Sequence, residues 1–388
     1  MANEQGFRSQ QVTIFKETTP GETPNPIAKG FSFGVINMSF NRNQRTETNA
    51  ELGNGGEGSR TDTGGEDPAG DMEVKYKSGL FPILAHAILG EADTKADPTV
   101  GVWTTATAYA VDDVTAHSGG KKLIVQSVEG TGTSGATEPD LTGLVDGDTV
   151  IDNAGANQIV WVVRDAIFDY TGTNKQDVPS MGMYIKDHTD QGGGVDFERT
   201  LRGFYFNSLT VGKESGNIIY KYSIPAIGMG IDVSTEAGYT TPTITSTVEI
   251  PDNPYKREEM CLTIGGVAPK NASSFILTIE RGTTMKDAVE CGFKIATTPQ
   301  ITVSGNMVVR FSKEEYIKAY NNQEEGIIIE YRKANGDFAK FTIPLTQKLD
   351  SPLNYSTEKP IELDIPLNAY GTKTTSTVSY YIRAATDL

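Results

Sequence analysis

Residues 70–90 read GDMEVKYKSGLFPILAHAILG, and they contain two different periodicities of apolar residues. Met72–Lys77 alternates apolar and polar side chains, which predicts a strand with one buried face. Leu80–Leu89 repeats apolar residues at helical spacing, with Pro82 in the first turn and Gly90 just past the end. The stretch therefore predicts a strand that is followed at once by a short amphipathic helix.

The same order recurs near the other end of the chain, at 305–320, which reads GNMVVRFSKEEYIKAY. The Gly, Met and Val are identical in the two strands, and Ser312 opens a capping box before the second helix. YKYSIPAIG at 220–228 and FAKFTIPLTQ at 338–347 form a second echo. This recurrence predicts two copies of one unit, a sheet with a helix, and a chain of that kind can close a pseudo-sixfold ring as a trimer. Six copies per ring would instead mean that 246–388 is not a second unit.

The rest of the chain predicts strands joined by turns, so we expect a mainly β protein. Residues 1–30 are polar and proline-containing, which indicates an extended N-terminal arm. Residues 41–71 form a long polar stretch without apolar periodicity, which is either functional or disordered. The expected strands lie at Phe31–Phe40, Ser180–Lys186, Gly203–Gly212, Asn217–Gly228, Ser274–Glu280, Gln300–Phe311, Gly326–Lys333, Phe338–Leu345, Ile361–Leu367 and Thr377–Arg383.

A change of composition at Asp97 and Pro98 marks a small all-β insert over 98–165, rich in Thr, Gly and Val. Its expected strands are Leu123–Val128 and Ile159–Val163, with turn signals between them. Trp103, Tyr109 and Trp161 are its notable aromatic residues. They form either its small core or a face on which a sugar ring stacks, and the sequence does not separate the two. The expected organisation is an arm (1–30), a first domain (31–97 and 166–245) that contains the insert, and a second domain (246–388).

The chain has 388 residues and a formal net charge of −16, which argues against binding to DNA phosphates or anionic membranes. No apolar run is long enough to span a bilayer. The three histidines, His86, His117 and His188, and the two cysteines, Cys261 and Cys291, lack metal-ligand or nucleophile spacing. We therefore expect no catalytic, cofactor-binding or metal site.

The stretch from Ser32 through LGNGGEGSR (52–60) to Leu89 and Gly90 resembles the start of siphophage major tail tube proteins, which belong to non-contractile, long-tailed bacteriophages. The resemblance resumes at GFYFNSLTV (203–211) and SSFILTIERG (273–282). It implies two tube-type β-sandwich or half-barrel domains, each with a flanking helix, in rings that stack into a tube. It also implies that 41–71 reaches the adjacent ring, disordered in the monomer and ordered in the tube.

The insert resembles a small β-module of phage virion proteins that is similar to chitinase-type carbohydrate-binding domains. The pattern includes Trp103, Tyr109, GTSGATEP (132–139), Asp152 and Trp161. Asp112 stands where that module usually has glycine. The resemblance implies host glycans as possible ligands of this module.

These observations together predict a structural virion protein of the phage tail, made and assembled in the host cytoplasm, and not an enzyme. Its expected partners are copies of itself in trimeric rings, the tail terminator and tail-tip proteins, and the tape-measure protein in the lumen. Genomic DNA passes from capsid to host without specific binding, because an acidic wall repels phosphate. No membrane partner and no cofactor are expected. The alternative is a carbohydrate-binding or virion-surface adhesion protein acting through 98–165.

Overall fold

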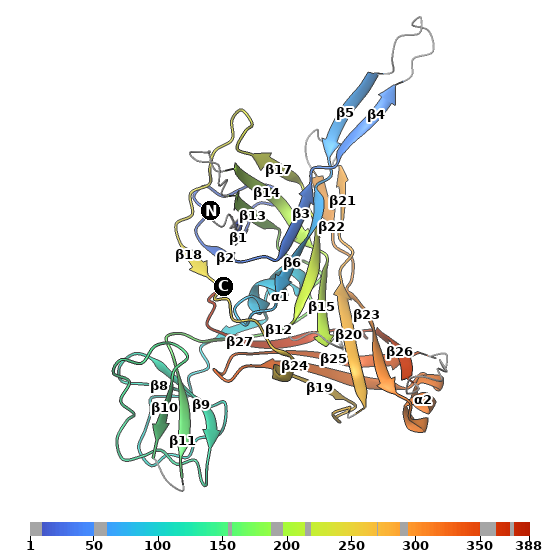
Figure 1. The fold of residues 1–388 in the computed structure, drawn as a ribbon. Helices are drawn as coiled ribbons and strands as arrows, with labels where there is room; N and C mark the ends of the chain where they lie inside the picture. The colour runs from blue at the N-terminus through green and yellow to red at the C-terminus, as the bar shows by residue number, and fades with distance from the viewer. Residues whose placement is uncertain are drawn as a thin grey trace, which may run out of the picture.

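The structure is a computed structural model that describes residues 10–49, 60–153, 157–187, 197–213, 219–269, 271–287, 294–349, 362–372 and 376–388. The described part is mainly β with two α-helices, which confirms the expected fold class. Figure 1 shows three lobes: an N-terminal unit, a C-terminal unit and the insert, with a long hairpin projecting from one end.

The N-terminal unit is built on a nine-stranded sheet ordered β18-β2-β1-β13-β14-β16-β6-β3, with β17 paired to β14. Strand β1 lies well inside this sheet, so the prediction of an extended arm over 1–30 is wrong for this segment. It pairs with β13 and β2, because Val12 and Ile14 are fully buried and anchor it to the core. The strands are β1 (Gln10–Lys16), β2 (Gly30–Phe33), β3 (Asn37–Asn41), β6 (Ala69–Lys75), β13 (Met181–Asp187), β14 (Phe197–Phe206), β16 (Lys221–Ile227), β17 (Gly230–Val233) and β18 (Thr247–Glu249).

The C-terminal unit is built on a ten-stranded sheet ordered β15-β20-β23-β26-β25-β27-β12-β7, with β24 and β19 attached beside β25. Three of its strands, β7, β12 and β15, come from sequence that was expected in the first domain. The strands are β7 (Thr94–Ala96), β12 (Phe168–Thr173), β15 (Ser208–Lys213), β19 (Met260–Ile264), β20 (Ala272–Glu280), β23 (Thr302–Arg310), β24 (Glu324–Arg332), β25 (Phe338–Lys348), β26 (Glu362–Ala369) and β27 (Ser379–Ala384).

The stretch 203–212, expected to be one strand, is shared by two strands that belong to different sheets. Strand β14 stays in the N-terminal unit, and β15 pairs along β20. Gly203 has a φ of 64° and Asn207 separates the strands, so the backbone turns from one sheet into the other. This crossing ties the two units together.

The two units repeat one topology in seven strands and a helix each. The elements of the N-terminal unit that recur are, in chain order, β1, β3, β6, α1, β13, β14, β16 and β17. Their counterparts in the C-terminal unit, in the same order, are β19, β20, β23, α2, β24, β25, β26 and β27. The pairings among these strands agree throughout. The register agrees as well, because Met72 lies opposite Ile224 and Met307 lies opposite Ile365. The counterpart of the Ile-Pro strand at 220–228 is therefore β26, so the match with 338–347 that the sequence suggested is wrong.

Two prolines confirm this alignment of the Ile-Pro strands. The carbonyl of Pro225 accepts the N–H of Asn207 at 2.8 Å, and the carbonyl of Pro366 accepts the N–H of Leu349 at 2.9 Å. Each bond ties the Ile-Pro strand to the residue just after β14 or β25. The same backbone contact at the same place in both units is what a duplicated domain produces.

The first helix, α1 (Phe81–Leu89), lies in the middle of the molecule rather than on its flank. Eight of its nine residues are buried, and Gly90 follows it with a φ of 102°. The ring of Phe81 lies 5.2 Å from that of Tyr331 and 5.6 Å from that of Phe341, both in the C-terminal unit. The Nε–H group of Arg281, also in the C-terminal unit, donates to the carbonyl of Ile88 at 2.8 Å and so caps the end of the helix. The core of the two units is therefore continuous through α1.

The second helix, α2 (Lys313–Tyr320), lies at the free end of the C-terminal unit. The Ser312 hydroxyl accepts the N–H of Glu315 at 3.1 Å, as the capping box predicts. The Glu315 side chain does not complete the box but binds Lys318 and Lys348. Ala319 is the buried residue of this helix.

Two hairpins occupy matching places in the duplicated units. The first, β4 (Gln44–Asn49) and β5 (Arg60–Glu66), connects β3 to β6. The second, β21 (Thr284–Asp287) and β22 (Lys294–Thr297), connects β20 to β23. The expectation of disorder over 41–71 is wrong for the paired residues of the first hairpin.

The insert folds as a separate four-stranded sheet, ordered β10-β11-β9-β8. The predicted strands at 123–128 and 159–163 are confirmed. Its strands are β8 (Val114–Ala116), β9 (Lys122–Val128), β10 (Thr149–Asp152) and β11 (Ile159–Arg164). A short 3-10 turn, Arg257–Glu259, follows the segment that links the two units.

His86 gives the fold a dependence on pH. Burial, and then the positive charge of Lys16, lowers the pKa of His86 to about 4, whereas an unfolded histidine titrates near pH ~6.5. The unfolded chain therefore binds the proton more tightly. The stabilisation that comes from keeping His86 neutral in the folded state is complete above pH ~6.5 and is lost as the pH falls toward about 4.

We expect His86→Gln to remove about 1–3 kcal/mol of the stability difference between pH 7 and pH 4.5, measured by denaturant unfolding at each pH. His117→Gln in the insert is the control, and an unchanged pH profile in His86→Gln would contradict the assignment.

Candidate assembly surfaces

Both hairpins project toward the same end of the molecule, β4–β5 the farther of the two (Figure 1). The shorter hairpin is held to the base of the longer one by Lys294, which begins β22, and Asp67, which follows β5; their Nζ and Oδ1 atoms lie 3.0 Å apart. Arg42 fixes the base of the longer hairpin, since its Nη2 donates to the Ile231 carbonyl at 2.7 Å and it pairs with Glu66 at 3.6 Å. This end therefore presents two anchored arms.

Below the arms, β3, β6 and β16 continue through β15 into β20, β23 and β26 as one curved wall. One face of the wall carries the core, including Met72 and Met307. The opposite face is mainly polar, apart from residues such as Ile276 and Val308, and its carboxylates outnumber its cations. The charged residues on that face are Asp71, Glu73, Glu280, Glu362, Asp364, Lys75, Lys221 and Arg310.

Asp71 lies at the centre of the polar face in the N-terminal unit. The hydroxyls of Ser39 and Ser223 donate to its two carboxylate oxygens at 2.7 Å and 2.9 Å. These bonds lower the pKa of Asp71, so it stays ionised. In the C-terminal unit the amide of Asn306 donates to Asp364 at 3.0 Å. Each unit thus holds one oriented carboxylate on the wall.

The insert docks on the turn between β24 and β25. Arg164, 2% exposed at its side chain, pairs with the 4% exposed Asp337 at 2.6 Å and also donates to the Asn335 carbonyl at 2.9 Å. Asp112, where the resembling module has glycine, adopts a φ of 74° and pairs with Arg332 at 2.6 Å. The strained aspartate is therefore a docking residue, because its carboxylate reaches the C-terminal unit.

The three aromatic residues of the insert converge on its interior. Trp161 is fully buried, and Trp103 and Tyr109 pack against the same small core. The ring of Tyr109 lies edge-on to Trp161 at 4.9 Å. Both indole N–H groups donate to Asp152, at 3.1 Å from Trp103 and 3.3 Å from Trp161. The structure brings the aromatic residues together but leaves no face of Trp161 open to a sugar. The role of Asp152 as their shared acceptor was missed by the sequence reasoning.

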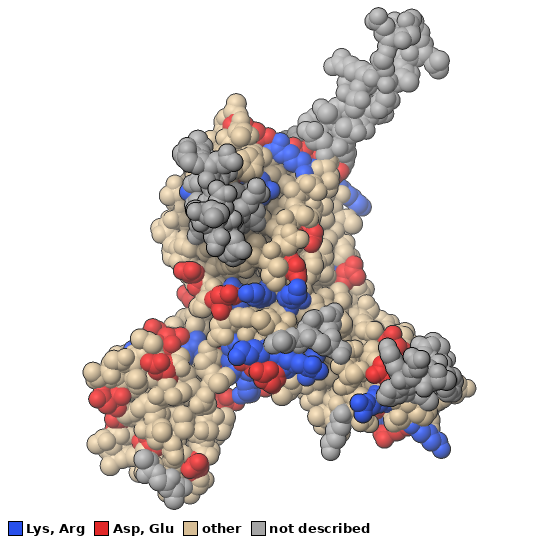
Figure 2. Space-filling view, viewed as in Figure 1, with Lys and Arg blue, Asp and Glu red and all other residues tan. Residues whose placement is uncertain are grey.

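Figure 2 shows acidic side chains scattered over the insert and mixed charges across the two units. Within the described residues no group of three or more His, Cys, Asp or Glu side chains could hold a metal ion. Among those same residues no helix is long and apolar enough to cross a membrane. Cys261 is an exposed free thiol, whereas Cys291 and His188 lie outside the described residues.

The chain matches one protein-family model, described as phage tail tube protein, over residues 8–369. The match spans both units, the wall and the insert. No curated protein matches the chain. A duplicated β-unit with a wall rich in carboxylates and two arms at one end is consistent with a subunit that assembles with copies of itself. The chain therefore belongs to the phage tail tube protein family and is a structural component of a bacteriophage tail.

Proposed function

We propose that three copies of this chain form a ring with pseudo-sixfold symmetry and that the rings stack into the tube of a non-contractile, siphophage-type tail. The duplication carries this proposal: two units of one topology, with Met72–Ile224 and Met307–Ile365 in the same register, stand side by side in one chain. Three such chains supply six similar units, and a heterologous contact repeated around an axis closes a ring.

The proposed domain division follows the strand pairing. The first tube domain comprises 10–97 and 166–245, interrupted by the insert at 98–165, and the second comprises 246–388, with β7, β12 and β15 exchanged into its sheet. The two anchored arms lie at one end and would reach the next ring of the stack. Tail terminator and tail-tip proteins would meet the first and last rings through the same surfaces.

The polar wall is the proposed lining of the lumen. Its carboxylates, with Asp71 and Asp364 as the oriented pair, repel DNA phosphates, so that DNA passes without being held. The tape-measure protein would occupy the same lumen during assembly in the host cytoplasm. The insert lies away from the wall in Figure 1, so we place it on the outer surface of the tube. The buried Trp161 gives no support to the alternative of glycan binding through this module.

Negative-stain electron microscopy of the purified chain, over a range of concentrations, tests the assembly directly. We expect hollow tubes of stacked rings whose end-on averages show three subunits and six similar wall segments. Chains that remain monomeric at every concentration would contradict the tube. Six subunits per ring would contradict the pairing of two tube domains in one chain.

The charge of the lumen has a measurable consequence. We expect tubes of Asp364→Lys to bind short double-stranded DNA with an affinity that falls steeply as salt is raised, whereas wild-type tubes bind none. Fluorescence anisotropy of labelled DNA measures both. Glu129→Lys, an exposed site in the insert, makes the same change of charge and should leave DNA unbound. Equal binding by the two variants would place Asp364 outside the lumen.

A further inference from the structure

We propose that the outward face of α2, formed by Phe311, Ile317 and Tyr320 and called here the α2 face, packs against the N-terminal unit of a second copy of this chain. The inference rests on the tube assembly proposed above and names one side of the joint between chains in the ring. The contact is heterologous, because the C-terminal unit of one copy meets the N-terminal unit of the next.

The α2 face is apolar and open to solvent. The side chains of Phe311, Ile317 and Tyr320 are 42%, 44% and 64% exposed. The ring of Tyr316 stacks on Tyr320 with centroids 6.3 Å apart and lies 6.3 Å from Phe311, so the rings form a continuous row. A surface helix ordinarily turns its apolar residues toward its own core, so this row is expected to have a partner.

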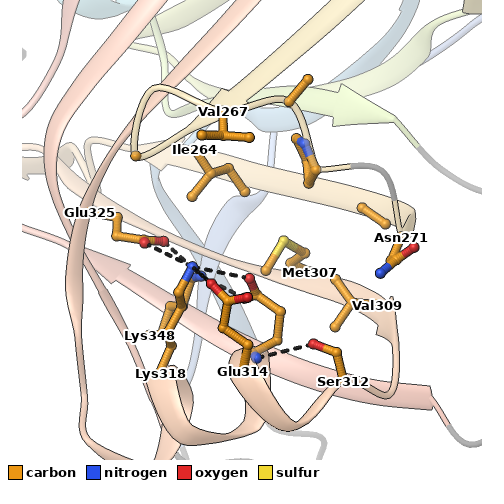
Figure 3. A pocket seen from close by; sticks show the side chains of 15 residues that line it. Ile264, Val267, Asn271, Met307, Val309, Ser312, Glu314, Lys318, Glu325 and Lys348 are labelled. Carbon is orange, nitrogen blue, oxygen red and sulfur yellow. Dashed lines mark hydrogen bonds and ion pairs between the residues drawn. The ribbon is translucent and has the colours of Figure 1, made fainter.

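The opposite side of α2 holds charged residues and faces the body of the protein. Lys348, with its side chain 3% exposed, lies 2.7 Å from Glu315 and 2.7 Å from Glu325. Lys318 lies 3.3 Å from Glu315 and 3.4 Å from Glu325. Figure 3 shows this network beside a pocket of about 350 Å³ whose far side is apolar and includes Ile264 and Met307. Because ion pairs anchor the inner side, the apolar side is held outward.

The duplicated unit shows what covers such a face. Aligning GDMEVKY (70–76) with GNMVVRF (305–311), and α1 with α2, places Tyr76 at Phe311, Phe81 at Ile317 and Leu84 at Tyr320. All three residues of the first set are buried, at 0%, 1% and 0% exposure.

The cover of α1 comes from the neighbouring unit. Phe81 contacts Tyr331 of β24 and Phe341 of β25, and Arg281 of the same unit caps the helix end. The N-terminal unit has the topology of this covering unit, with β13 and β14 in the places of β24 and β25. The second copy's N-terminal unit can therefore cover α2 as the C-terminal unit covers α1.

Strand β3 is a second open surface that belongs to the same joint. Its counterpart β20 is covered along its outer edge by β15, the strand that the first domain contributes to the sheet of the C-terminal unit. Strand β3 ends its sheet, and no described strand pairs with its outer edge. Within one chain the contact between the two units is complete, because α1 and β20 are both covered. The α2 face and the outer edge of β3 are the two uncovered sides of a second contact of the same kind.

The double variant Ile317→Ser with Tyr320→Ser tests the α2 face, because both side chains are exposed and the isolated fold does not depend on them. We expect the concentration needed for assembly to rise at least about a hundredfold, from the lost burial of two large apolar side chains, with unchanged thermal unfolding of the monomer. Light scattering and electron microscopy measure the assembly. Val100→Ser with Val102→Ser is the matched control, since these insert residues are 84% and 64% exposed, and it should assemble like the wild type.

The outcomes separate this inference from the proposed function. Wild-type tubes together with unimpaired assembly of the Ile317→Ser, Tyr320→Ser variant would overturn the α2 joint and leave the tube standing. A wild-type chain that never assembles would overturn both. A photo-crosslinking amino acid at position 320, in tubes mixed from ¹⁴N and ¹⁵N chains, identifies the partner. Intermolecular products within 181–249 support the joint, and products confined to the C-terminal unit of the other copy overturn it.

Discussion

Replacing Phe81 with alanine is expected to lower the free energy of unfolding by about 3–5 kcal/mol, the usual range for a phenylalanine removed from a closed core. Phe81 is 1% exposed, and its ring touches those of Tyr76, Tyr255, Tyr331 and Phe341 at centroid distances of 5.1–5.6 Å. The aromatic rings come from both units and from the linker, so they cannot collapse onto the cavity from one side. Guanidinium unfolding of the monomer measures the loss.

Ile317→Ala is the matched control for this prediction, because Ile317 occupies the position of Phe81 in the second unit. It is 44% exposed, so in the monomer the change should cost less than about 1 kcal/mol. The two positions are equivalent in sequence and differ in what covers them. Similar costs at both positions would mean that α1 is not held between the units.

The second large effect is expected at the docking site of the insert. Asp337→Ala leaves the guanidinium of Arg164 buried without its carboxylate, which costs about 3–5 kcal/mol when one partner of a buried pair is removed. The remaining partner, Asp146, has a side chain 41% exposed and is a weaker counterion. Denaturant unfolding measures the cost. Hydrogen exchange at the β24–β25 turn, where the Lys333 N–H bonds to the Asp337 carbonyl, should rise with it.

Two further variants serve as controls for this expectation. Removing both charges, as Arg164→Met with Asp337→Leu, should restore most of the stability, because no unpaired charge stays buried. Arg332→Ala removes the ion pair to Asp112, where the arginine side chain is 40% exposed, and should cost less than about 1 kcal/mol. An Asp337→Ala variant as stable as Arg332→Ala would show that the insert does not depend on the buried pair.

Local patterns account for what the sequence predicted correctly. The apolar stripe of 80–89 and the Ser312 cap predicted both helices, because helix signals lie within a few residues of one another. The strands of the insert were predicted for the same reason, with alternation and turn residues close together. The candidate aromatic residues were found, but their arrangement around Asp152 was not, since Asp152 ends β10 whereas its donors Trp103 and Trp161 lie in a loop and in β11.

Local sequence patterns were enough to predict that one short unit occurs twice, that both copies pass from strand to helix, and that a separate module interrupts the first. These are statements about neighbouring residues, and backbone geometry enforces them locally. Long-range packing, in contrast, places β1 in a sheet, moves β15 to the other unit and makes Ile365, not Ile343, the partner of Met307. It also encloses α1 and leaves α2 open. Strand pairing and burial depend on residues far apart in the chain, so equal local patterns acquire different surroundings.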